Sequence, residues 1–331
     1  GDPSVSTGVG KAVESIAALG LEAEIVAHSM ATRSGINQAK ACGADRVAIF
    51  FATSQIHLDA KLNKTPEEAI EIICDHISYA RELGLKVRYT PEDATRTDIE
   101  FLVDVCNAAI EAGADRISFA DTLGVVQPYI FYDNVRALRE HLQPCKIDLH
   151  CHNDYGLALA NAMEGIRAGG DCIHTTVNGL GERTGIPDLA ETILAFNNLR
   201  QTQKYNLEPL VELSRYLEKI SGFFMAPNKP ITGQNAFTHK SGVHTNGILK
   251  DPRTYEPFDP AMLGRERKIV IDKYTGKSAV AARLDEYDVE VSQSELDVIV
   301  SRIKNLDENR KRLFDTDILD IAEQVTGREI D

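Results

Sequence analysis

Hydrophobic positions recur along the chain in a fixed order: an amphipathic helical stretch, a glycine, a few polar residues, and a short run rich in β-branched residues. Glycine is favoured after a helix because the chain often continues there through a residue with positive φ. The helix-ending glycines are Gly20, Gly43, Gly84, Gly113 and Gly170. This order predicts repeated βα units and a parallel sheet.

Six strands of this kind can be recognised, and the same rhythm is typical of both a (β/α)8 barrel and an open doubly wound sheet. The polar residues distinguish the two folds, because they cluster at the carboxyl ends of nearly all the strands. These residues are His28, Thr53, Arg88, Glu92, Asp121, Thr122, His150, His152, Thr176 and Asn178. Polar residues at the ends of consecutive strands are the layout of a barrel active site. The sequence therefore predicts an α/β fold of the TIM-barrel type.

A closed barrel has eight strands, so we expect the first strands to be lacking in this chain. The opening segment GDPSVS is interpreted as the loop after a missing strand, ahead of a helix over residues 10–19. We assign residues 1–200 to the catalytic barrel, 201–275 to a connector and lid region, and 276–331 to a small, mostly helical C-terminal module. Helical periodicity over the last segment supports its assignment.

Composition narrows the class of protein. The 331 residues carry a net charge of −14, which would repel phosphate backbones and argues against a nucleic-acid partner. We expect no membrane association, because no apolar run is long enough to span a bilayer. Six cysteines are scattered without a CxxC pair, which fits reduced thiols in a cytoplasmic protein.

The motif LHCHND places two histidines at the end of a strand. Because alternate strand residues point to the same side, His150 and His152 present their imidazoles together, while Cys151 faces the other way. Two neutral imidazoles suit a divalent metal ion, with a carboxylate or water to complete the site. Two histidines bonded to core carbonyls would have the same spacing, but the position at a strand end favours the metal.

The segment KVRYTPED places a cation within an apolar strand. Arg88 must be paired there, either with a structural carboxylate or with an anionic group of a substrate. Thr90 and Glu92 follow at alternate positions, and Glu92 is either a general base or an ordinary loop residue. Asp93 is a candidate cap for the next helix.

Residues 237–256 lie beyond the predicted barrel and contain His239, His244 and Tyr255. Titratable side chains in a glycine-containing segment outside the core are typical of a lid. An ordinary surface loop would have the same composition.

These motifs, in this order and spacing, resemble the barrel metallolyase family that includes the homocitrate, isopropylmalate and citramalate synthases. The resemblance rests on LHCHND, NGLGERTG, TPEDATRTD, ADTLG and FTHKSGVH. It implies an acyltransferase that condenses acetyl-CoA with a 2-oxo acid and uses a divalent metal ion (Zn, Mg or Mn). His150 and His152 would bind this ion together with a carboxylate of the first strand, which we expect to be missing from this chain.

The resemblance also implies roles for the other candidates. Glu92, His244 and Tyr255 would assist removal of a methyl proton from acetyl-CoA. His244 and Tyr255 would come from the neighbouring subunit of a homodimer, as lid residues donated in trans. The substrate-binding candidates are His28, Arg88, Thr90 and Thr122.

Three alternatives to the homocitrate branch are open. Arg88 favours that branch, because it matches an arginine that binds the distal carboxylate of 2-oxoglutarate, and a substrate without this group would leave the cation unpaired. The segment ATSQIHLDAKL is instead similar to the isopropylmalate and citramalate branches. An acyl-CoA lyase would carry a cysteine in the loop that here is TTVNGLGERTG. A metal-binding fragment without activity is the third alternative.

Overall fold

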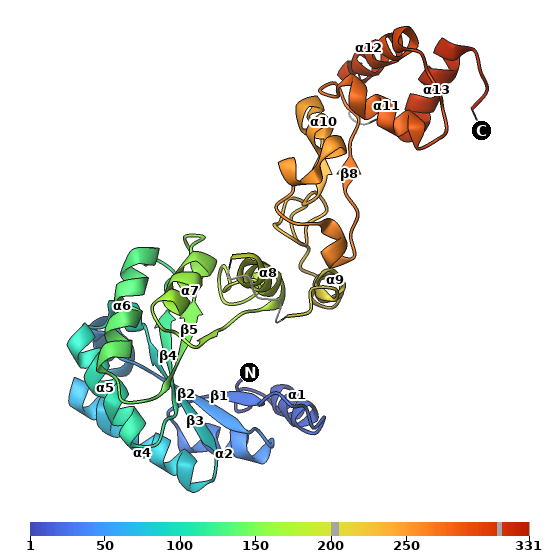
Figure 1. The fold of residues 1–331 in the computed structure, drawn as a ribbon. Coiled ribbons are helices and arrows are strands. Elements are labelled where there is room, and N and C mark those ends of the chain that lie inside the picture. The colour runs from blue at the N-terminus through green and yellow to red at the C-terminus, as the bar shows by residue number, and fades with distance from the viewer. Residues whose placement is uncertain (200–204, 310–312, 331) are drawn as a thin grey trace. The chain divides into compact units, whose positions relative to one another are not determined.

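The computed structural model describes residues 1–199, 205–309 and 313–330. The chain divides into two compact units, Gly1–Thr192 and Ile193–Asp331, each with its own core (Figure 1). The predicted boundary between residues 200 and 201 falls outside the described residues, so the predicted domain limits stay a prediction.

The first unit is built on six parallel strands that neighbour one another in the order of the sequence. They are β1 Val26–Met30, β2 Arg46–Ala52, β3 Lys86–Glu92, β4 Arg116–Asp121, β5 Lys146–Cys151 and β6 Cys172–Ile173. A doubly wound sheet reverses its strand order at a switch point, whereas the strands of a barrel follow one another around its wall. The consecutive order therefore confirms the predicted α/β fold of the TIM-barrel type.

Helix α1 Thr7–Ala17 precedes the first strand, and the helices between successive strands cover one face of the curved sheet (Figure 1). They are α2 Arg33–Ala41, α3 Gln55–His57, α4 Pro66–Glu82, α5 Ile99–Glu111, α6 Pro128–His141 and α7 Ala158–Arg167, with a π-helical turn at Leu58–Leu62. Local sequence explains where they begin. The long helix α4, for example, starts with a capping box formed by Thr65 and Glu68 and has Pro66 at its first position.

The predicted helix-ending glycines mostly have the expected backbone. Positive φ angles occur at Gly20, Gly43, Gly84 and Gly113. The prediction for Gly170 is wrong, because helix α7 is capped by Ala168 and the positive φ of 110° falls on Gly169. Gly170 is required for space instead: a Cβ atom there would lie 2.9 Å from Cδ1 of Leu149.

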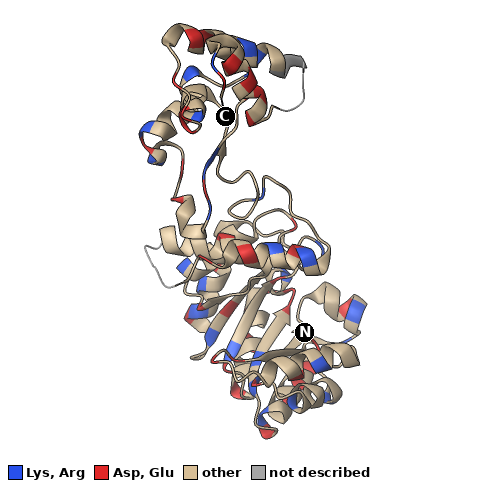
Figure 2. Ribbon diagram, turned by 90° about the vertical axis from the view of Figure 1, so that its right-hand side faces the viewer, with Lys and Arg blue, Asp and Glu red and all other residues tan. Residues whose placement is uncertain are grey.

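The second unit is mostly helical. Helix α8 Leu189–Leu199 spans the boundary, and then follow α9 Leu210–Ser221, α10 Gly242–Lys250, α11 Lys277–Asp285, α12 Gln293–Asn309 and α13 Asp315–Thr326, with one parallel strand pair, β7 Thr238–His239 and β8 Lys268–Ile269. Isoleucine, leucine, valine and alanine side chains of α11, α12 and α13 form its core. Acidic and basic residues are interspersed along the helices of both units (Figure 2). Within the described ranges, no helix is long and apolar enough to cross a membrane.

Candidate active site

The strands of the first unit separate apolar from polar side chains by alternation. Odd-numbered strand residues such as Val47, Val87 and Ile117 are fully buried in the core beneath the helices. Even-numbered residues point to the opposite side. We call this side the polar face; it carries His28, Arg88, Thr90, Arg116, Ser118, Asp148, His150 and, after the last strand, His174.

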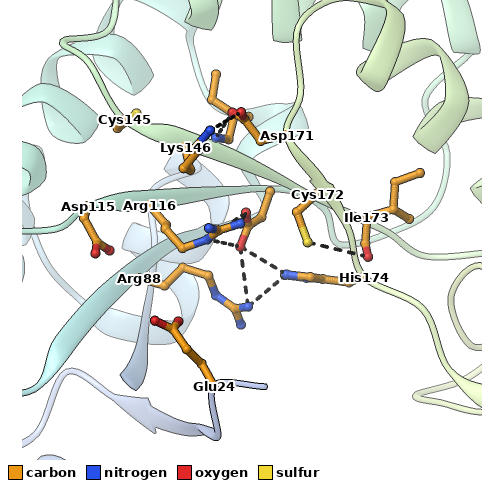
Figure 3. A network of polar contacts seen from close by, with 12 residues as sticks. Glu24, Arg88, Asp115, Arg116, Cys145, Lys146, Asp171, Cys172, Ile173 and His174 are labelled. Carbon is orange, nitrogen blue, oxygen red and sulfur yellow. Dashed lines mark hydrogen bonds and ion pairs between the residues drawn. The ribbon is translucent and has the colours of Figure 1, made fainter. Parts of the chain in front are cut away.

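A charged network crosses the polar face (Figure 3). Asp148 accepts hydrogen bonds from Nε of Arg116, which lies 3.0 Å and 3.1 Å from its two carboxylate oxygens. The guanidinium of Arg88 is farther away, with Nη1 3.7 Å from Oδ2 of the same aspartate. Although burial acts to raise it, the pKa of Asp148 is held below its usual value by its close contacts with His174 and Arg116. Two guanidinium groups therefore share one carboxylate, and Arg116 holds it more closely.

The remaining contacts of Arg88 are with imidazoles. Its Nη1 donates to Nε2 of His174 at 2.8 Å, and its Nη2 donates to Nε2 of His28 at 3.2 Å. Burial lowers the pKa of His28 to about 4 and also lowers the pKa of His174, so both rings are neutral at pH 7. Arg88 itself is only 8% exposed, and burial lowers its pKa. It is a buried cation with too little negative charge around it, which is the arrangement expected of an anion-binding site.

His150 and His152 lie at the end of β5 with their ring centroids 5.1 Å apart. Burial lowers the pKa of both residues, so both are in the neutral form that binds metal ions. Nδ1 of His152 is buried and has no hydrogen-bond partner within the described part of the chain. These two residues fit a divalent metal ion as two of its ligands. In residues 1–199, 205–309 and 313–330, no group of three or more His, Cys, Asp and Glu side chains could hold an ion alone.

Other atoms of the polar face also lack partners. Nε of Arg88, Oγ1 of Thr90 and Oγ of Ser118 are buried and make no hydrogen bond to any residue that the structure describes. Buried polar groups in proteins are nearly always bonded, either to the protein or to water or a ligand. Their concentration on one face of the sheet indicates that this face receives a polar ligand.

Glu92, the predicted base, is the last residue of β3, and 21% of its side chain is exposed. Nζ of Lys61 lies 2.7 Å and 2.8 Å from its two carboxylate oxygens. Thr122, which follows β4, accepts a hydrogen bond from the backbone N–H of Asp93 at 2.8 Å. Thr122 therefore supports the turn after Glu92.

Two residues near these strand ends have structural roles that differ from the sequence prediction. Asp93 stands at the N-cap position of the short 3₁₀ turn Ala94–Arg96, but its side chain makes no capping hydrogen bond and is buried against other side chains, while Asp98 caps α5. Asp121 has an odd number and faces the helices, where its carboxylate accepts hydrogen bonds from Thr95 and from the backbone N–H of Val126.

Comparisons with known proteins agree with this geometry. The HMGL-like family matches residues 1–217, and the homocitrate synthase post-HMGL domain-like family matches residues 231–311. The homocitrate synthase of Sulfurisphaera tokodaii is 45% identical over 332 residues, which cover 99% of this chain and 72% of that protein. The chain belongs to the homocitrate synthase family.

Other relatives give the same assignment. The homocitrate synthase of Saccharolobus solfataricus is 44% identical, again over 99% of this chain and 72% of that protein. A crystal structure of the HMG-CoA lyase of Bacillus subtilis superimposes with a TM-score of 0.57 at 21% identity, covering 67% of this chain and 78% of that chain. At that identity the likeness concerns the fold alone. The homocitrate synthase family implies a divalent metal ion and acetyl-CoA.

The two other predicted catalytic residues of this homocitrate synthase family member lie in the second unit. His244 is on α10, and Tyr255 follows the short 3₁₀ turn Pro252–Thr254. Their rings are stacked, with centroids 4.0 Å apart and 28° between the planes. The structure thus brings these two residues together, whereas His239, the other histidine of the predicted lid, is paired with the buried Glu256 at 3.3 Å.

Sequence reasoning missed three members of the charged network: Arg116, Asp148 and His174. The signal that could have found them is the alternation that identified the histidine pair. Asp148 lies two residues before His150, and His174 lies two residues before Thr176. Extending the even-numbered series backward along each strand would have placed all three on the polar face.

Proposed function

We propose that this chain is an acyltransferase that condenses acetyl-CoA with 2-oxoglutarate and releases homocitrate and CoA. The main support is Arg88, a buried cation on the polar face that shares its nearest carboxylate with a second arginine. The 45% identity to a homocitrate synthase supports the same reaction. Isopropylmalate and citramalate synthases would follow the same chemistry, but their 2-oxo acids lack a second carboxylate.

The substrate is bound, in this proposal, by donors on the polar face. The distal carboxylate of 2-oxoglutarate would accept from Arg88, whose Nε has no partner in the described residues, and from Oγ1 of Thr90, two residues further along the strand. His28 holds the other end of the guanidinium through Nη2. A charge-assisted bond to a buried arginine is stronger than a neutral one, and it discriminates against substrates without the anion.

His150 and His152 would hold the divalent ion, for which zinc, magnesium and manganese are the candidates. An ion bound there would polarise the ketone of the 2-oxo acid as a Lewis acid. The protein's own contribution is to keep both imidazoles neutral and to orient them. His174 lies with Nδ1 3.0 Å from Nδ1 of His150, so it fixes the orientation of that ring.

Glu92 is the proposed base that removes a proton from the methyl group of acetyl-CoA. The methyl carbon then attacks the ketone carbon of the 2-oxo acid, and water hydrolyses the thioester to release CoA. His244 and Tyr255, stacked in the second unit, would assist from the neighbouring subunit of a homodimer. Both the homodimer and a cytoplasmic location stay predictions.

The test is CoA release from acetyl-CoA with 2-oxoglutarate, 2-oxoisovalerate or pyruvate, each with and without added divalent metal. We expect metal-dependent release that is fastest with 2-oxoglutarate. Preference for one of the other two acids would keep the condensation and overturn the substrate. Failure with all three acids in the presence of each metal would refute the proposed function.

A further inference from the structure

The region beside Glu92 contains a histidine that the proposed reaction has not used. Helix α3 ends at His57, and the π-helical turn Leu58–Leu62 follows it directly. Together they place His57 and Lys61 next to Glu92 at the end of β3. We propose that His57 is a positioning residue that accepts the proton from Glu92 and is itself held by Asp93. This inference rests on the proposed function.

The contact with Asp93 determines which nitrogen of the ring carries the hydrogen. Nδ1 of His57 lies 3.0 Å from Oδ2 of Asp93, and the Asp93 side chain has no exposed surface. An ionised carboxylate can only accept hydrogen bonds, so Nδ1 must be the donor. When Nδ1 carries the only hydrogen of the ring, Nε2 has a free lone pair. The hydroxyl group of Ser54, 2.9 Å from Nδ1, holds the ring from the same side.

The free lone pair faces the proposed base. Nε2 of His57 lies 3.8 Å from Oε1 of Glu92, and the two side chains are about equally shielded, with 20% and 21% of their surfaces exposed. Displacing each side chain by a few tenths of an ångström brings such a pair within proton-transfer distance, and apo sites often require such a shift. The three groups thus lie in the order Asp93, His57 and Glu92. The carboxylate of Asp93 orients the imidazole of His57, and this imidazole accepts a proton from the carboxylate of Glu92.

The proton can be followed through this arrangement. The methyl C–H bond of acetyl-CoA breaks, its electron pair stays on carbon, and Glu92 becomes protonated. The carboxylic acid then gives this proton to Nε2 of His57, which becomes an imidazolium between two carboxylates. Glu92 returns to its ionised form without exchanging its proton with bulk water.

Two carboxylates lie next to the ring of His57. The charged groups facing His57 are the carboxylates of Glu92 and Asp93, the ammonium of Lys61 beyond Glu92, and the guanidinium of Arg96, which lies 2.7 Å from Asp93. Each cation is bonded to a carboxylate rather than to the ring. A proton accepted at Nε2 would therefore lie between the carboxylates of Glu92 and Asp93.

The decisive variant is His57→Asn, because its amide N–H occupies the place of Nδ1–H and can still donate to Asp93, while the acceptor at Nε2 is lost. We expect kcat to fall by roughly tenfold or more, with KM for both substrates nearly unchanged, as for loss of a proton-transfer group. The rising limb of the pH profile of kcat should also change. The matched control is His141→Asn on the exposed end of α6, which should leave all these values as they are.

A second variant separates proton transfer from packing. His57→Ala should lose activity, and added imidazole should restore part of it by supplying the missing acceptor. Normal turnover by His57→Asn would refute the role of His57, and so would a loss in His57→Ala that imidazole does not relieve. Absence of CoA release by the unmodified protein would instead refute the proposed function itself, so the two failures are distinguishable.

Discussion

Arg46 and Arg88 are two buried arginines on neighbouring strands with opposite surroundings. Arg46 begins β2, where Nε donates to Glu24 at 3.0 Å and Nη2 donates to Asp115 at 3.2 Å. Arg88 lies beside the residue two positions further along β2, and its nearest carboxylate oxygen is 3.7 Å away on Asp148, which another arginine already binds. The two cations are similarly buried, at 5% and 8% exposed, but they differ in their supply of anions.

The pKa shifts of the two arginines follow this difference. Burial acts to lower the pKa of Arg46, yet its hydrogen bonds with Asp115 and Glu24 raise the pKa overall. Burial lowers the pKa of Arg88, because fewer negative charges lie near its guanidinium to offset the effect of burial. The N-terminal end of the sheet thus supplies its own counter-ions, whereas the polar face further along the strands leaves room for a ligand's charge. In barrel enzymes, residues at the N-terminal ends of the strands contribute to stability, and residues at the C-terminal ends carry out catalysis. We call this the division between the two ends of the sheet.

The sharpest test of this division compares two neighbouring residues on β5. His150→Ala removes a proposed metal ligand, and we expect metal-dependent CoA release to fall by about 1,000-fold or more, since metal ions contribute several kcal/mol to such reactions. Cys151→Ala, on the helix side of the same strand, should cost about 1 kcal/mol of unfolding free energy and leave activity intact. Steady-state kinetics and urea unfolding check both. Full turnover by His150→Ala would remove this residue from the site.

Arg88→Ala tests whether the under-compensated cation binds substrate. We expect kcat/KM for 2-oxoglutarate to fall by about 100-fold, as for loss of a buried charge-assisted bond, while pyruvate is affected much less. Stability should change little, because Arg116 still pairs with Asp148. Pyruvate is the internal control. Equal losses for the two acids would mean that Arg88 only supports the network.

Arg46→Ala tests the other member of the comparison. The change leaves Glu24 and Asp115 without this partner, and both are partly exposed, so we expect a loss of about 2 kcal/mol rather than the larger cost of a fully buried pair. Activity per folded molecule should be unchanged. Arg33→Ala is the matched control, because the Arg33–Asp75 pair is half exposed and should be worth less than about 1 kcal/mol. A drop in kcat without loss of stability would contradict the division.

The comparison also explains how far the sequence could predict this protein. The parallel strands and the barrel type followed from the recurrent helix, glycine and strand order, because these signals are local. The pair His150 and His152 followed from alternation within one strand. Both signals lie within about ten residues of each other in the chain. Over that distance the backbone geometry alone determines where the side chains point.

Contacts between distant segments could not be predicted in this way. Arg88 and His174 are 86 positions apart in the chain, and their contact depends on the register of four strands. The sequence left open whether Arg88 is paired with a structural carboxylate or with a substrate. In the structure, Arg88 shares the carboxylate of Asp148 with Arg116. This arrangement lies between the two alternatives. His57 lies on the short helix α3 and Lys61 on the π-helical turn after it, and no residue pattern predicted that turn.

The smallest expected effect belongs to Glu24 at the N-terminal end of the sheet. Hydrogen bonds from Lys86 and Arg46 lower the pKa of Glu24 from 4.5 to about 2. Because the folded pKa is the lower one, Glu24 stabilises the protein above about pH 4.5, and this contribution disappears as the pH falls from there toward 2. Its side chain is 39% exposed, so solvent screening keeps the contribution below about 1 kcal/mol.

Glu24→Gln should therefore lower the free energy of unfolding slightly at pH 7, and the difference from the unmodified protein should shrink below pH 4.5. Urea unfolding from pH 7 to pH 3 measures this difference, with Glu22→Gln, an exposed glutamate of the same loop, as the matched control. A difference that stays constant down to pH 3 would show that Glu24 acts through packing rather than charge. A fall in CoA release at pH 7 would be more serious, because it would connect the N-terminal end of the sheet to catalysis and end its distinction from the polar face around Arg88.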